Sequence, residues 1–174
     1  IPDLHPYVPG KPLSELEREL GIKDSIKLAS NENPLGPSPL AMAAVREAAL
    51  DWARYPDGGA FDLRRALAEY HRVEPESVII GNGSNDVLDI IARTFLAPGV
   101  EAVYDQHAFA VYPICTQAVG ARGRVAPAQD GSRGPRYGHD LEAMRGLINR
   151  DTRVVFIANP NNPTGTSLSG PELE

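Results

Sequence analysis

Short apolar runs alternate with longer amphipathic stretches from residue 77 to residue 158. The runs predict strands over 78–80, 102–104, 123–126 and 154–158, the last of them strongly buried. The stretches between them place apolar residues three and four positions apart and predict helices over 84–96, 109–119 and 140–149. Strands and helices in this order form a mainly parallel sheet covered by helices. The expected fold class is therefore α/β, with three layers in the order αβα.

Two more helical patterns precede this region. Ser38 and Pro39 are typical of a helix start, and the pattern continues to about residue 53. Asp62 can cap a second helix, which ends near Arg72. The apolar side of each helix is expected to pack in the core. Its members are Met42, Val45, Ala49 and Trp52 in the first helix, and Leu63, Ala66, Leu67 and Tyr70 in the second.

The start of the chain is rich in proline. Seven prolines lie among the first 39 residues, and the one helical pattern there covers residues 14–20. Proline disfavours helix interiors and sheet pairing but allows extended backbone. The sequence therefore predicts an extended arm over residues 1–37, lying on another surface, and a domain over residues 38–174.

Composition and charge argue against several classes of binding partner. The 174 residues are 42% hydrophobic and 23% charged, as in ordinary globular proteins. The longest apolar run is far short of the roughly 20 residues of a membrane helix. The net charge of −6 argues against nucleic-acid or anionic-membrane partners. Cys115 has no second cysteine to pair with and is expected to pack in the core, which suits a reducing cytoplasm, and the scattered histidines predict no metal site.

Ligands of parallel sheets bind beyond the carboxyl ends of the strands, so the loops there are candidate sites. Gly81–Asp86 has two glycines before a helix, whose first amides can bind a phosphate. The segment does not match the dinucleotide-binding fingerprint, because Asp86 stands in place of the third glycine. It does not match the P-loop either, because no Gly-Lys-Ser/Thr follows. An ordinary capped turn remains the alternative.

Two other loops carry candidate contacts. Phe109 follows a predicted strand and either lies on a planar cofactor ring or packs in the core. Asn159–Gly165 holds two prolines, three asparagines and a glycine, a composition typical of a rigid loop that presents amide groups. An asparagine there could donate a hydrogen bond to a phenolate oxygen of a bound ring.

These loops carry a family resemblance. Asn159–Gly165, the Gly83-Ser84-Asn85 turn and Phe109 together resemble the fold-type I pyridoxal-phosphate aminotransferases. Three more segments resemble, within them, the histidinol-phosphate aminotransferases: Tyr7–Pro12, Leu28–Gly36 and Arg54–Gly58. The resemblance spans nearly the whole chain and roughly the first half of that family's proteins. It implies that residues 38–174 are an incomplete large domain of this fold, with residues 1–37 contacting the dimer partner and the small domain.

The resemblance also assigns roles in binding pyridoxal 5′-phosphate. Gly83, Ser84 and Asn85 would bind its phosphate with backbone amides and a hydroxyl. Phe109 would stack on its pyridine ring, and Asn162 would bond its 3′ oxygen.

Three further roles concern the neighbouring subunit and the substrate. Tyr55 would reach the phosphate of the neighbouring subunit's cofactor, which implies a homodimer with shared active sites. Tyr7 and Asn33 would lie near the substrate. The implied reaction moves an amino group between L-histidinol phosphate and 2-oxoglutarate, in histidine biosynthesis in the cytoplasm.

The family's Schiff-base lysine lies downstream of the Asn-Pro-Thr-Gly motif, whereas the last lysine here is Lys27. Ser169–Glu174 has the pattern of a helix's first turn, so the sequence is expected to be interrupted there, with that lysine beyond Glu174. The 174 residues alone are therefore expected to be inactive. Alternatives are an aromatic amino-acid aminotransferase, a related pyridoxal-phosphate decarboxylase and, in another class, a non-catalytic binding or dimerisation module.

Overall fold

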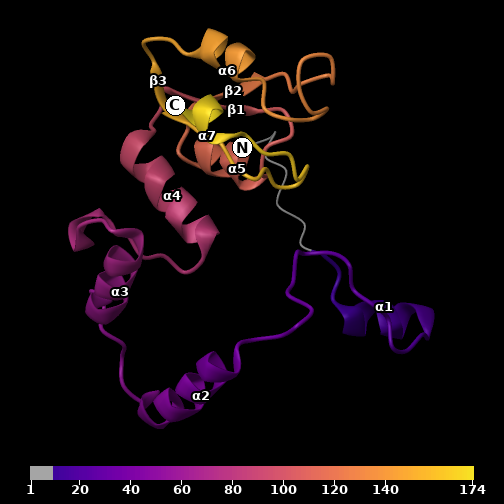
Figure 1. Ribbon diagram of the computed structural model, residues 1–174, viewed down its shortest axis with the longest axis vertical. Helices are drawn as coiled ribbons and strands as arrows, with labels where there is room; N and C mark the ends of the chain where they lie inside the picture. Colours follow the sequence, from indigo (N-terminus) through magenta and orange to yellow (C-terminus); the bar gives the residue numbers. More distant parts are fainter. Residues whose placement is uncertain (1–9) are drawn as a thin grey trace. The chain divides into compact units, whose positions relative to one another are not determined.

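The computed structural model describes residues 10–174, which fall into two compact units (Figure 1). One unit comprises residues 79–174, and the other extends from the start of the described chain to residue 78. The domain boundary that the sequence places between residues 37 and 38 stays a prediction. No helix within residues 10–174 is long and apolar enough to cross a membrane.

A parallel sheet forms the centre of the C-terminal unit. Its strands are β1 (Glu101–Asp105), β2 (Arg122–Ala126) and β3 (Thr152–Val155), in the spatial order β2-β1-β3. Both neighbours of β1 run parallel to it, and β1 pairs with β2 along its whole length. All five residues of β1 are buried, as expected for a central strand covered on both faces. The predicted parallel sheet is confirmed.

Helices cover both faces of this sheet (Figure 1). They are α4 (Ser84–Phe95), α5 (Val111–Ala118) and α6 (Leu141–Leu147), and the short α7 (Gly170–Leu173), which has no buried residue, follows β3. Successive residues of a strand point to opposite faces. Tyr104 of β1 therefore lies in the core formed with α4 and α5, whereas Val103 packs with Met144 of α6. The predicted order of three layers is confirmed.

Two strand predictions differ from the structure. No strand forms over residues 78–80 in the described chain, although the backbone of Val78 is extended with φ −105° and ψ 121°. A run of apolar residues predicts burial, but a strand also requires a partner. The last strand ends at Val155, and Val155 and Ile157 are 39% and 40% exposed, because β3 has β1 on one side only within the described sheet.

The N-terminal unit is helical. Its elements are α1 (Leu13–Leu20), α2 (Pro39–Ala48), the 3₁₀ turn η1 (Ala49–Asp51), α3 (Phe61–His71) and the 3₁₀ turn η2 (Pro75–Ser77). The three helices confirm the predicted segments to within a few residues. Ser38 takes the N-cap position of α2, but its side chain makes no capping hydrogen bond.

The predicted cap of α3 is wrong. Asp62 lies inside the helix, and the N-cap position is taken by Ala60, with φ 47°. The carboxylate of Asp57 accepts the backbone N–H groups of Gly59 and Phe61 at 2.9 and 2.8 Å. These two hydrogen bonds hold the pKa of Asp57 below its usual range. A carboxylate in the preceding turn thus satisfies amides at the start of α3.

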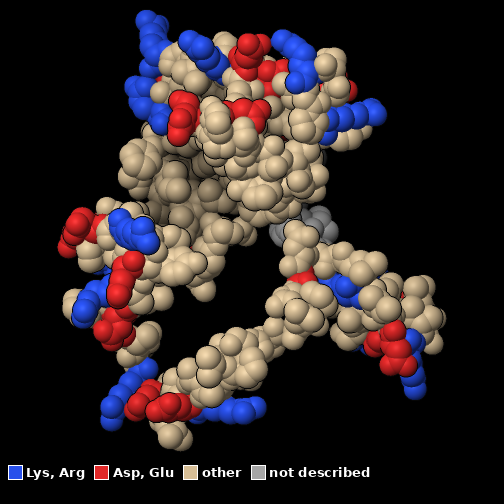
Figure 2. All heavy atoms as spheres, viewed as in Figure 1, with Lys and Arg blue, Asp and Glu red and all other residues tan. Residues whose placement is uncertain are grey.

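The expected core packing of α2 and α3 is also wrong for this chain. No residue of α2 or η1 is buried, Trp52 is 71% exposed, and Ala68 is the one buried residue of α3. An amphipathic pattern predicts which side of a helix is apolar, but burial needs a second layer against that side. Figure 2 shows acidic and basic side chains interspersed on the visible face of both units.

Candidate functional site

The phosphate-binding candidate is a tight turn at the start of α4. Gly83 has φ 84°, a conformation that favours glycine. A Cβ on Gly81 would meet Cγ2 of Val87 at 2.7 Å, so the turn closes directly onto the helix. Asp86 accepts the N–H of Asn82 at 2.9 Å. The first amides of α4 have no acceptor within the helix and are therefore available to an anion.

Ser84 and Asn85 are both exposed in this turn. Their position in the first turn of a 12-residue helix places a hydroxyl and backbone amides at its positive end. The structure thus provides the donor groups that the sequence predicts for a phosphate. Asp86 closes the turn through the N–H of Asn82, whereas no side chain of a described residue caps the N-terminus of α4 at Gly83.

Phe109 belongs to a row of aromatic rings. It is half-buried against the core cluster of α4 and α5, and its ring meets that of Tyr112 edge-on, with centroids 6.0 Å apart. Tyr112 in turn stacks on Phe156 at 4.5 Å. Phe109 therefore packs against the core, as one of its two interpretations predicts. This packing fixes the ring at the carboxyl end of β1.

The three asparagines of the last loop have different surroundings. The side chain of Asn159 bonds both backbone groups of Leu168. Asn161 is 3% exposed and donates to the carbonyl of His107 at 3.2 Å and to the hydroxyl of Thr164 at 2.8 Å. Asn162 is exposed, and its side chain makes no hydrogen bond to any residue that the structure describes. Of the three amides, that of Asn162 is the one available to a ligand.

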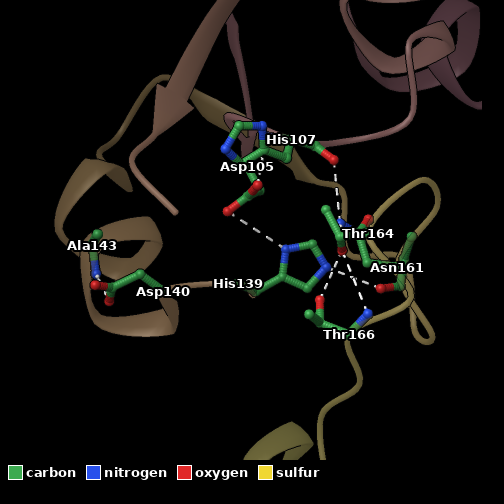
Figure 3. A network of polar contacts seen from close by, with 9 residues as sticks. Asp105, His107, His139, Asp140, Ala143, Asn161, Thr164 and Thr166 are labelled. Atoms are coloured by element: carbon green, nitrogen blue, oxygen red, sulfur yellow. Dashed lines mark hydrogen bonds and ion pairs between the residues drawn. The ribbon is translucent and has the colours of Figure 1, made fainter. Parts of the chain in front are cut away.

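A buried polar pair lies behind these loops (Figure 3). His139 is 6% exposed and Asp105, at the end of β1, is 1% exposed. Nδ1 of His139 lies 3.7 Å from Oδ2 of Asp105, and its Nε2 lies 2.9 Å from the carbonyl oxygen of Ala158. Sequence reasoning missed Asp105, His139 and Asn161. For Asp105 a signal exists, because it is a charged residue at the end of a buried strand.

A pocket of about 410 Å³ opens between two of the loops. Its lining comprises His107, Ala108, Tyr137, Pro163 and Thr164. The first two residues directly precede Phe109, and the last two directly follow Asn162. The pocket is thus lined by sequence neighbours of two predicted cofactor contacts.

Three of the predicted site residues lie outside this arrangement. The side chain of Tyr55 is fully exposed in the N-terminal unit. In the same unit the side chain of Asn33 bonds the backbone of Leu35 and Gly36, closing a turn. Tyr7 lies outside the described residues. The structure thus brings Phe109 and Asn162 to one edge, and the roles of Tyr55, Asn33 and Tyr7 stay predictions.

Comparison with known proteins identifies the family. The family described as aminotransferase class I and II matches residues 23–174. The chain belongs to this family. Similar relatives include histidinol-phosphate aminotransferase 2 of Methylococcus capsulatus, 61% identical over 98% of this chain, and that of Pseudomonas aeruginosa, 57% identical over 100%. The chain spans about half the length of these curated relatives, 46% of each.

Solved structures agree with this family. Histidinol-phosphate aminotransferase from Sinorhizobium meliloti, in complex with pyridoxal-5′-phosphate, superposes with a TM-score of 0.82 and 28% identity. That match covers 95% of this chain and 44% of the other. N-succinyldiaminopimelate aminotransferase from Mycobacterium tuberculosis gives a TM-score of 0.75 at 26% identity, covering 92% and 43%. The predicted fold, part of a fold-type I aminotransferase, is confirmed.

Proposed function

We propose that the whole protein transfers an amino group between L-histidinol phosphate and 2-oxoglutarate. The observation that carries this proposal is the 57–61% identity over nearly the whole chain to relatives named for that activity. The aminotransferase fold by itself supports several substrates, because fold does not determine substrate. The two small molecules, and histidine biosynthesis in the cytoplasm, belong to the proposal.

The site residues suit pyridoxal 5′-phosphate as cofactor. The cofactor has a dianionic phosphate, a flat aromatic ring and a ring oxygen. The chain offers one matching group for each: the open first turn of α4, the fixed ring of Phe109, and the exposed amide of Asn162. When bound, the cofactor supplies an electron sink for the electrons of the broken Cα–H bond. The protein supplies the groups that would hold the cofactor in place and the polar surroundings of its phosphate and ring oxygen.

Each group has a distinct task in this proposal. The amides of Gly83, Ser84 and Asn85, with the Ser84 hydroxyl, hold the phosphate at the positive end of α4. Phe109 covers one face of the ring and excludes water from it. Asn162 would donate a hydrogen bond to the ring oxygen and so help to orient the cofactor.

The remaining tasks are a covalent attachment of the cofactor, a proton transfer and a contact from a second subunit. A lysine would hold the cofactor and move the proton at the substrate Cα, but no lysine follows Lys27. We place that lysine outside these 174 residues. We further propose a homodimer in which Tyr55 of one subunit reaches the phosphate bound by the other. The full exposure of Tyr55 supports this role, since its hydroxyl is available to a second subunit.

Substrate comparison tests the proposal. The purified full-length protein, loaded with pyridoxal phosphate, is assayed with 2-oxoglutarate and either histidinol phosphate or phenylalanine. We expect a higher kcat/KM for histidinol phosphate. A higher value for phenylalanine would reassign the protein to aromatic amino acids, and CO₂ release without glutamate formation would reassign it to the decarboxylases. Absence of any reaction or cofactor binding would favour the binding module.

A further inference from the structure

The loops that carry Phe109 and Asn162 are more than 50 residues apart in sequence, yet in the proposed function both contact one small ring. Phe109 follows β1 and Asn162 follows β3. Stacking and hydrogen bonding both depend on separations of a few tenths of an ångström. Some group must therefore hold the two loops at a constant spacing. In Figure 3 the side chain of His139 lies between Asp105 and the loop of Asn161, Thr164 and Thr166.

Through Nε2, His139 binds the loop that follows β3 and carries Asn162. A carbonyl oxygen only accepts hydrogen bonds, so the 2.9 Å contact with Ala158 requires Nε2 to carry a proton. Ala158 directly precedes Asn159, the first residue of the Asn-Pro loop. The imidazole therefore holds the point at which this loop leaves the sheet.

The other side of the imidazole faces Asp105, where the loop that carries Phe109 begins. Nδ1 points to Oδ2 of Asp105 at 3.7 Å, and the other carboxylate oxygen accepts the N–H of His107 at 2.6 Å. Both side chains are almost fully excluded from solvent, at 2% and 0% exposure. No hydrogen bond satisfies Nδ1 of His139 or Oδ2 of Asp105 within the described chain. Each is therefore the main polar neighbour of the other.

A buried imidazole and a buried carboxylate are expensive to keep out of water, and each of these two makes a hydrogen bond to one of the loops: Nε2 of His139 to the carbonyl of Ala158, and Asp105 with the N–H of His107. A fold that needed only stability could fill this space with apolar residues at similar or lower cost. The pair also does what an apolar pair could not, because it ties one loop by the N–H of His107 and the other by the carbonyl of Ala158. Asn161 adds a second tie between the same loops, at the carbonyl of His107.

We propose that His139, together with Asp105, is a positioning residue that sets the spacing between Phe109 and Asn162 and so the geometry of the bound cofactor ring. The inference rests on the proposed function for the identity of the cofactor. His139 contacts neither cofactor nor substrate in this proposal. It acts through the two loops that do.

The test uses variants of the full-length holoenzyme. His139→Leu removes both polar contacts at similar size. His139→Gln keeps a donor that can reach the carbonyl of Ala158. His71→Gln, at the exposed end of α3, is the matched control. The readouts are the cofactor dissociation constant, the absorption band of the bound cofactor, and thermal unfolding.

We expect His139→Leu to bind pyridoxal phosphate about tenfold more weakly and to shift the absorption band. His139→Gln recovers most of the affinity and the band, and His71→Gln matches wild type. A folded Leu variant with wild-type affinity and band would overturn the inference, because a purely structural role changes the unfolding temperature alone. Failure of Gln to improve on Leu would overturn it as well.

A second variant decides the matter if His139→Leu does not fold. Asp105→Asn keeps an acceptor for the N–H of His107 and removes the charge that faces His139. We expect cofactor binding about threefold weaker, with a smaller shift of the band; an unchanged band and affinity would contradict the proposal. Wild-type enzyme that binds no pyridoxal phosphate would overturn the proposed function too. Normal wild-type binding with unaltered variants would overturn only the role of His139.

Discussion

At the scale of single residues, three similar asparagines have three different roles. Asn159 and Asn161 use their amides to hold the loop, whereas the amide of Asn162 faces solvent. The sequence motif alone identifies the loop as functional but does not separate structural from ligand-binding members. The distinction follows from burial, because a buried amide must find partners within the protein.

This difference predicts opposite effects of alanine substitutions in the full-length enzyme. Asn162→Ala is expected to weaken pyridoxal phosphate binding roughly fivefold to tenfold, since one ligand hydrogen bond is lost, with little change in stability. Asn161→Ala is expected to lower the free energy of unfolding by about 1–3 kcal/mol, because the carbonyl of His107 loses a buried partner. Spectrophotometric cofactor titration and urea unfolding measure the two effects. A stable, weakly binding Asn161→Ala beside an unchanged Asn162→Ala would reverse the assignment.

Cys115 is a packing residue whose surroundings predict a pH effect. It is 3% exposed and donates to the carbonyl of Tyr112 at 3.3 Å. Burial raises the pKa of its thiol, and burial likewise raises the pKa of Tyr104 and Tyr112. A raised folded pKa means that the unfolded chain loses its proton at lower pH than the folded chain. The contribution of Cys115 to stability is therefore complete below the pKa of the unfolded thiol, about 9, and falls as the pH rises toward the folded value.

Cys115→Ser isolates the cysteine part of this effect. Serine can keep the bond to Tyr112, so we expect little change in cofactor binding at pH 7. Urea unfolding at pH 7 and pH 10 should show a smaller alkaline loss of stability for the variant than for wild type, since the tyrosines contribute equally to both. Identical losses in the two proteins would show that Cys115 titrates alike when folded and unfolded.

At the scale of elements, helices were predicted closely and strands less so. Helix periodicity is a local property of the sequence, and α4 was predicted to within one residue. The strand over 78–80 was predicted from an apolar run, but a strand depends on a partner elsewhere in the chain. The start of α3 shows a similar limit, because the capping carboxylate comes from Asp57 in the turn and not from Asp62.

Separate alanine substitutions of these two aspartates test the capping of α3. Asp57→Ala is expected to accelerate hydrogen–deuterium exchange at the start of α3, because the N–H groups of Gly59 and Phe61 lose their acceptor. Asp62→Ala is the control and should leave exchange there nearly unchanged. In wild type the protection should fall at acidic pH as Asp57 takes up a proton, since its pKa is lowered only while the turn is formed. Equal exchange in the two variants would contradict the structure.

At the scale of the whole molecule, the chain contains the groups predicted to bind the cofactor, but no lysine follows them. The phosphate turn, Phe109 and the Asn-Pro loop are all present, while the three lysines lie at Lys11, Lys23 and Lys27. The exposed apolar side chains of α2 and α3 belong to helices that no second layer covers within the described residues of their unit. Both features agree with a chain that covers 46% of its similar relatives.

This composition predicts that the 174 residues, expressed alone, form no glutamate from histidinol phosphate and 2-oxoglutarate. The full-length protein is the positive control in the same assay. Borohydride reduction in the presence of pyridoxal phosphate provides a second readout, because it marks any lysine bound to the cofactor. Turnover by the short chain, with a reduced adduct on Lys11, Lys23 or Lys27, would contradict the prediction.

The sequence by itself determined the α/β class, the order of helices, the family resemblance and the loops that carry the site. These features are encoded in local periodicity and in short motifs, which neighbouring residues define. The tertiary structure decided which asparagine is exposed, which aspartate caps α3, whether an apolar run finds a partner strand, and that Asp105 and His139 meet. The cap of α3 is a local contact of two and four residues that periodicity alone does not reveal. The pairing of strands and the meeting of Asp105 and His139 depend on residues far apart in sequence, and only the folded chain brings those together.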